Sequence, residues 1–107
     1  MPRKARKEAL LSALSLKNRD GKIIVVDKLE LEDAKTKLMV KALAELKVTS
    51  ALIVISQPDA TIERSSRNIP AVKVLRVEGL NVYDLVRYEH LILTEGALKL
   101  LEERLAA

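Results

Sequence analysis

Residues 23–26 read IIVV, a run of four β-branched side chains with no polar residue between them. Apolar residues at consecutive positions, rather than at alternate ones, predict a strand that is buried on both faces. Burial of this kind is typical of a parallel strand in a sheet that helices cover on both sides. The run therefore predicts a fold built around parallel strands.

Helical and strand patterns alternate on the C-terminal side of this run, and another helical pattern precedes it. Asn18 to Gly21 ends the first helix with turn residues, and Asp59, Asn81 and Thr94 stand where helix N-caps are expected. Asp84 stands three residues after Asn81, as in a variant of the capping box. Helices are expected at residues 4–17, 33–46, 59–67, 82–88 and 95–105, and strands at residues 23–26, 51–55, 72–77 and 91–93.

Four strands that alternate with helices predict an α/β fold with a parallel sheet and helices on both of its faces. The 107 residues are enough for one packed core but too few for two. We expect a single domain over residues 1–107, in which a basic N-terminal helix (1–20) precedes the alternating core (21–107). Periodicity leaves the order of the strands in the sheet open.

The composition excludes several functional classes. The chain has no cysteine and one histidine, which argues against disulfides, thiol chemistry and imidazole-based metal clusters. Tyr83 and Tyr88 are the only aromatic residues, so a base-stacking surface is nearly excluded. No apolar run has the length of a membrane span and no signal-peptide pattern opens the chain, which favours a cytoplasmic protein.

Nucleotide and catalytic motifs are missing where this fold would carry them. Asp27-Lys28 follows the first strand in place of a glycine-rich turn, and three glycines cannot supply a phosphate-binding loop. Asp27 and Asp59 could share a Mg²⁺ ion, but helix capping by Asp59 is the favoured interpretation. His90 precedes a strand and is expected at the surface or at an edge.

Basic residues form two candidate binding groups, and each has a structural alternative. The net charge is +4, and residues 1–7 hold four basic residues and no acid, which indicates one face suited to phosphates. A disordered, solubilising tail is the alternative for this segment. Arg64 and Arg67 share a helix face, where they could grip phosphates. Asn68 could instead end this helix with a left-handed backbone, and Arg87 could pair with Asp84.

The chain resembles the family of large-subunit ribosomal protein four, and in particular its C-terminal globular half. The most specific segments of the resemblance are residues 66–70 (SRNIP), 72–75 (VKVL) and 78–85 (EGLNVYDL). Further similar segments extend it over essentially all 107 residues. These segments are residues 2–14, 21–27, 35–37, 91–94 and 97–98.

The resemblance implies a Rossmann-like, three-layer α/β/α domain with a four-stranded parallel sheet. It also implies a structural constituent of the large ribosomal subunit, located on cytoplasmic ribosomes, which binds large-subunit ribosomal RNA and contacts neighbouring ribosomal proteins. No enzymatic activity, cofactor, metal, membrane or small-molecule substrate is implied. The RNA-facing roles carry over to Arg3, Lys4, Arg6, Lys7, Arg64, Arg67 and Asn68.

Members of the resembled family begin with another segment of roughly equal length, which includes a long basic extension. The present sequence starts at a position that corresponds to the second half. It is therefore interpreted as a truncated core domain of that family. The alternative is an engineered or excised folded scaffold that has lost most of its RNA binding.

Overall fold

The computed structural model describes residues 3–27 and 36–106 of the chain, and the expected helix start at 33–35 lies outside them. No helix within these ranges is long and apolar enough to cross a membrane. The helices are α1 (Arg3–Arg19), α2 (Thr36–Glu45), α3 (Ala60–Ser66), α4 (Val82–Arg87) and α5 (Glu95–Ala106), with a 3-10 turn η1 (Val77–Gly79). The strands are β1 (Ile23–Val26), β2 (Ala51–Ile55), β3 (Val72–Arg76) and β4 (His90–Thr94).

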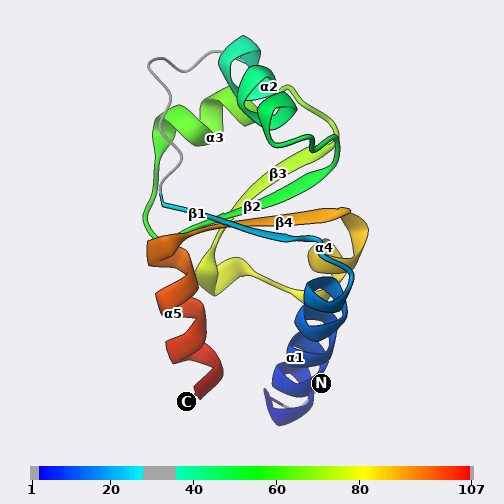
Figure 1. The fold of residues 1–107 in the computed structure, drawn as a ribbon. Helices are drawn as coiled ribbons and strands as arrows, with labels where there is room; N and C mark the ends of the chain where they lie inside the picture. The colour runs from blue at the N-terminus through cyan, green and yellow to red at the C-terminus, as the bar shows by residue number, and fades with distance from the viewer. Residues whose placement is uncertain (1–2, 28–35, 107) are drawn as a thin grey trace.

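The four strands form one sheet in the order β1-β4-β2-β3, and every neighbouring pair is parallel. Helices α2 and α3 cover one face of the sheet, and α1, α4 and α5 cover the other (Figure 1). The expected three-layer α/β/α fold with a four-stranded parallel sheet is thus confirmed. The last strand, β4, lies between β1 and β2. Among the described strands, only β3 therefore pairs with the strand that precedes it in the chain.

Alternate residues of the two central strands build two separate hydrophobic cores. In β2, Leu52 and Val54 face the layer of α1, α4 and α5, whereas Ile53 and Ile55 face the layer of α2 and α3. All five residues of β2 are buried, as the unbroken apolar run of this strand predicts. Burial of one side chain of this size contributes about 1.5–3 kcal/mol, so the two central strands anchor both layers.

Strand β1 departs from the expectation of burial on both faces. Among the described strands β4 is its only neighbour, which places it at the edge of the sheet, and Val25 is 46% exposed. Ile23 packs against one core and Ile24 against the other, so the apolar run does face both layers. An edge position leaves part of the strand uncovered, which the residue pattern alone cannot reveal.

Helices α1 and α2 end in the same backbone motif with different residues at its critical position. Gly21 has a φ of 69°, and the amide of Lys22 donates to the carbonyl of Lys17 at 2.9 Å. Lys47 has a φ of 59°, and the amide of Val48 donates to the carbonyl of Leu43 at 3.0 Å. Both are Schellman motifs, in which a left-handed residue follows the helix. Glycine adopts this conformation without strain, but lysine does not.

We expect Gly21→Ala to lower the free energy of unfolding by about 1 kcal/mol, because a Cβ there is strained at positive φ. Lys47→Gly should raise it by about 0.5 kcal/mol, because it removes that strain at some cost in chain entropy. Gly79→Ala is the control, since the nearest atom to an added Cβ is 3.9 Å away. Equilibrium denaturation in urea measures all three, and equal effects at Gly21 and Gly79 would contradict the assignment.

Candidate nucleic-acid interface

The basic residues near the N-terminus belong to a continuous helix and not to a disordered tail. Helix α1 begins at Arg3, whose side chain lies outside the described part of the structure. Lys4 and Arg6 are exposed to solvent, and Lys7 is half-buried. The structure therefore holds Lys4, Arg6 and Lys7 on a single rigid element, where their spacing along the chain is fixed.

Arg6 and Lys7 line a groove of about 850 Å³ that runs between α1, the η1–α4 segment and α5. Apolar side chains from all three elements, including Leu10, Val82 and Leu105, form part of its lining. Arg104 of α5 also lines it, and its Nη1 donates to the carbonyl of Val77 at 2.7 Å. Arg104 was not predicted, because nothing local in the sequence indicates that the last helix lies near the first.

The second basic group lies on the opposite face of the sheet. Arg64 lies in the last turn of α3, Arg67 follows as its C-cap and Asn68 comes next, and all three are exposed. Arg67 also lines a smaller groove of about 390 Å³ with Lys73 of β3. The left-handed termination predicted for Asn68 is wrong, since Lys47 is the only described non-glycine residue with positive φ.

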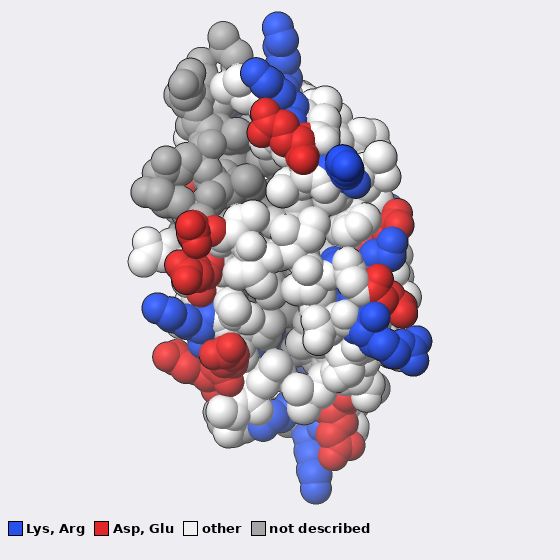
Figure 2. Space-filling view, in the orientation of Figure 1, with Lys and Arg blue, Asp and Glu red and all other residues white. Residues whose placement is uncertain are grey.

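The structure gathers each basic group locally but keeps the two groups apart. Helix α1 packs in the core that contains Leu10 and Leu101, and α3 packs in the core that contains Ile62. The sheet separates these two layers (Figure 1). Acidic and basic side chains alternate around the margin of the face shown in Figure 2, which leaves an uncharged centre. The two basic groups therefore do not share one phosphate-binding face.

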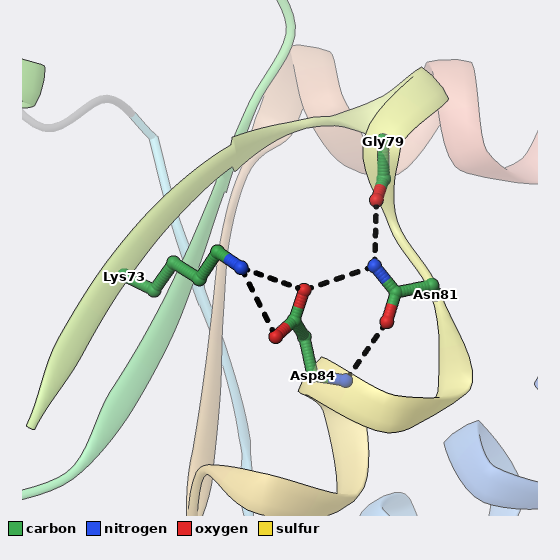
Figure 3. A network of polar contacts seen from close by, with 4 residues as sticks. All are labelled: Lys73, Gly79, Asn81 and Asp84. Atoms are coloured by element: carbon green, nitrogen blue, oxygen red, sulfur yellow. Dashed lines mark hydrogen bonds and ion pairs between the residues drawn. The ribbon is translucent and has the colours of Figure 1, made fainter.

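A polar network joins the edge strand β3 to the start of α4 (Figure 3). The Lys73 ammonium donates to both oxygens of Asp84, at 3.2 and 3.1 Å. The Asn81 side chain caps α4 by accepting from the Asp84 amide at 2.9 Å. Its Nδ2 group also donates to the Asp84 carboxylate at 2.9 Å and to the Gly79 carbonyl at 3.1 Å. These four residues fix where α4 begins.

Asp84 is a buried carboxylate that stays ionised. Burial opposes its charge, but hydrogen bonds from Asn81 and Lys73 and the charge of Lys73 outweigh burial and lower the pKa of Asp84 below its ordinary value. The N-cap predicted for Asn81 is confirmed. The capping-box variant differs from expectation, because the Asp84 carboxylate accepts from the side chain of Asn81. Pairing of Arg87 with Asp84 was left open as an alternative, and the ion pair of Asp84 is with Lys73.

Polar residues at or after the carboxyl ends of the strands cap the N-termini of the next helices. Asp59 caps α3 by accepting from the amides of Thr61 and Ile62, at 3.0 and 3.2 Å. Thr94 caps α5 by accepting from the amide of Ala97 at 3.2 Å. The capping interpretation of Asp59 is thus confirmed. In the described ranges, no group of three or more potential metal ligands gathers around it or elsewhere.

Two further residues lie near the two ends of the central strand β4. Gly96 lies so close to β2 that an added Cβ would be 3.0 Å from the Ser56 hydroxyl, so the start of α5 covers the end of that strand. His90 is half-buried in the central strand β4 rather than at an edge.

Fold and surface together define a three-layer α/β domain that carries exposed basic residues on the helices of both outer layers. The chain belongs to the Ribosomal protein L4/L1 family, whose sequence profile matches residues 1–104. The resemblance inferred from residues 66–85 and their surroundings is thereby confirmed.

Individual relatives match nearly the whole chain. This chain is 49% identical to the large ribosomal subunit protein uL4 of Desulfosudis oleivorans over 105 residues, which cover 98% of this chain and 51% of that protein. The uL4 protein of Desulforamulus reducens is 47% identical over 106 residues, which cover 99% of this chain and 52% of that protein. The chain thus spans about half the length of the relatives it matches.

Proposed function

We propose that this chain is the globular core of a structural protein of the large ribosomal subunit and that it binds large-subunit ribosomal RNA. Membership of the Ribosomal protein L4/L1 family over residues 1–104 carries the proposal. The relatives named above are large-subunit proteins. The proposal includes a location on ribosomes in the cytoplasm, contacts with neighbouring ribosomal proteins and no enzymatic role.

The RNA contacts are proposed to lie on both outer layers of the domain. Exposed cations on α1 attract phosphates mainly by charge, in a manner largely independent of sequence. The arginines of α3 add planar guanidinium groups, each of which can donate two parallel hydrogen bonds to one phosphate. Residues on opposite faces of the sheet would contact different RNA segments, so the domain would be held between them. The RNA-facing residues proposed are Arg3, Lys4, Arg6, Lys7, Arg64, Arg67 and Asn68.

Charge reversal tests the two surfaces separately. We expect each reversed pair to weaken binding to large-subunit ribosomal RNA fragments by about tenfold or more, since one hydrogen bond to a charged group contributes roughly 1.5–3 kcal/mol. The dependence of log affinity on log salt should also become shallower by about 1 for each phosphate contact that is lost. The pairs are Lys4→Glu with Arg6→Glu on α1, and Arg64→Glu with Arg67→Glu on α3.

The control is Lys37→Glu with Lys41→Glu on α2, where both lysines are exposed and the net charge changes by the same amount. Equal losses in all three double variants would mean that only the overall charge matters. The competing proposal is a folded scaffold without retained RNA function, which the mixed charges in Figure 2 favour. It predicts affinity for ribosomal RNA no tighter than the nonspecific range of about 10⁻⁴–10⁻⁶ M.

A further inference from the structure

The exposed side of α4 is the least covered apolar surface in the described part of the chain. Tyr83 is 72% exposed and Val86 is 68% exposed, more than any other large hydrophobic residue there. The other aromatic residue, Tyr88, is 6% exposed and packs in the core. The chain therefore presents one of its two aromatic rings to solvent.

Contacts at both ends hold α4 in place. At its start, the Asn81 cap and the Lys73–Asp84 pair tie it to β3, as Figure 3 shows. At its end, the ammonium of Lys17 from α1 donates to the carbonyls of Tyr88 at 2.6 Å and Glu89 at 3.0 Å. A side chain on this helix is thus presented from a fixed backbone, which reduces the entropy lost when a ligand binds.

The local charges select the kind of ligand. The only acid of α4 is Asp84, which is buried and paired with Lys73. Arg87 is exposed one helical turn after Tyr83, and its guanidinium carbon lies 5.6 Å from the centre of the Tyr88 ring. Stacking of this kind orders the arginine without using its hydrogen-bond donors. The exposed side of α4 therefore combines an aromatic face, an aliphatic neighbour and an oriented cation.

We propose that Tyr83 and Arg87 form a nucleotide-binding site for unpaired RNA, in which a base stacks on the Tyr83 ring and a phosphate pairs with Arg87. Every base offers a face for stacking, so such a site tolerates any sequence but requires an unpaired nucleotide. An acidic or apolar protein segment is the other kind of partner with matching chemistry. The ribosomal family and the cation favour RNA. This inference rests on the proposed function and adds a recognition mode that the composition nearly excluded.

The test compares single-stranded and fully paired RNA. We expect Tyr83→Ala to weaken binding to a single-stranded oligoadenylate by about tenfold, because stacking on one aromatic ring contributes roughly 1–3 kcal/mol per base. Tyr83→Phe should bind like the wild type, and binding of Tyr83→Ala to a duplex of equal length should be unchanged. Arg87→Ala should make the dependence of log affinity on log salt shallower by about 1.

Tyrosine fluorescence should fall on binding in the wild type and remain constant in Tyr83→Phe, whose remaining tyrosine is buried.

Leu11→Ala on α1 is the matched control, since it removes another exposed apolar side chain, 39% accessible, and should leave RNA binding unchanged. If Tyr83→Ala binds single strands as the wild type does while charge reversal on α1 still weakens binding to ribosomal RNA, the stacking site is wrong and the proposed function stands. If the wild type binds every RNA no more tightly than the nonspecific range, both proposals are wrong. A loss of protein association without a loss of RNA binding in Tyr83→Ala would assign the surface to a protein partner and overturn the inference.

Discussion

Leu85→Ala is expected to lower the free energy of unfolding by about 3 kcal/mol, the largest stability effect we predict for a single substitution in α4. Leu85 is fully buried in the core that α1, α4 and α5 share with the sheet. Its truncation removes buried methyl groups and leaves a cavity, and the helix cannot move to close it because both of its ends are anchored. Thermal unfolding should shift down by roughly 10–20 °C.

Val86→Ala is the matched control, because the next residue of the same helix is 68% exposed. Its effect should remain within about 0.5 kcal/mol, since surface substitutions away from special features rarely exceed this. Equilibrium unfolding in urea gives both values on one scale. A loss of less than about 1 kcal/mol in Leu85→Ala would show that α4 can be displaced from the core, and would remove the rigid platform on which the stacking site depends.

Asp84→Asn is expected to lower the free energy of unfolding by about 1–2 kcal/mol at pH 7. The asparagine keeps the size of the side chain but offers one acceptor oxygen where the carboxylate offers two. Lys73 and Asn81 then lose part of their hydrogen bonding, and the charge that neutralises Lys73 is gone. We place the loss at the lower end for a charged hydrogen bond, because the Lys73 side chain is 43% exposed and can regain water.

The pH dependence separates this charge from a packing effect. The folded state lowers the pKa of Asp84, so its stabilisation is complete above the ordinary value of about 3.9 and is lost as the pH falls through the lower folded-state value. The wild type should therefore lose stability more steeply than Asp84→Asn below about pH 4, and the two curves should converge. Glu89→Gln is the control: a hydrogen bond from Lys22 also lowers the pKa of Glu89, but that pair is exposed, so the same pH dependence should appear with a smaller amplitude. A constant gap between wild type and Asp84→Asn down to acid pH would contradict the assignment.

Elements whose signals are local were predictable from the sequence. Strands β1 and β2 have the bounds that their apolar runs predict, and Asp59, Asn81 and Thr94 cap the helices that they precede. A short side chain with an acceptor oxygen satisfies the first free amides of a helix wherever that helix packs, so the capping signal survives without knowledge of the tertiary fold.

Features that depend on contacts between distant segments were not predictable. The exposure of Val25 follows from the strand order, which periodicity does not contain. The approach of Arg104 to α1 across a groove follows from the packing of two helices on one face of the sheet. Lys73, which the sequence did not single out, pairs with Asp84 because β3 brings its ammonium group there from eleven residues away. In each case a tertiary contact decided the outcome.

The same limit applies to the candidate interface. Both basic groups could be found from charge and helical spacing, but their separation by the sheet could not. The exposure of Tyr83 was also hidden, because the sequence shows two similar tyrosines five residues apart and only packing distinguishes them. Aromatic content alone therefore does not reveal whether a ring is exposed and available for stacking.

The strand order also has a consequence for synthesis on the ribosome. Of the strands that the structure describes, β1 pairs with β4 alone, so it cannot join the sheet until residues 90–94 have left the exit tunnel. The β2–β3 pair, linked through α3, contains its own parallel partner and can form earlier. During vectorial synthesis α1 and β1 must therefore wait as an open, partly apolar segment, and the sheet closes only after β4 has emerged.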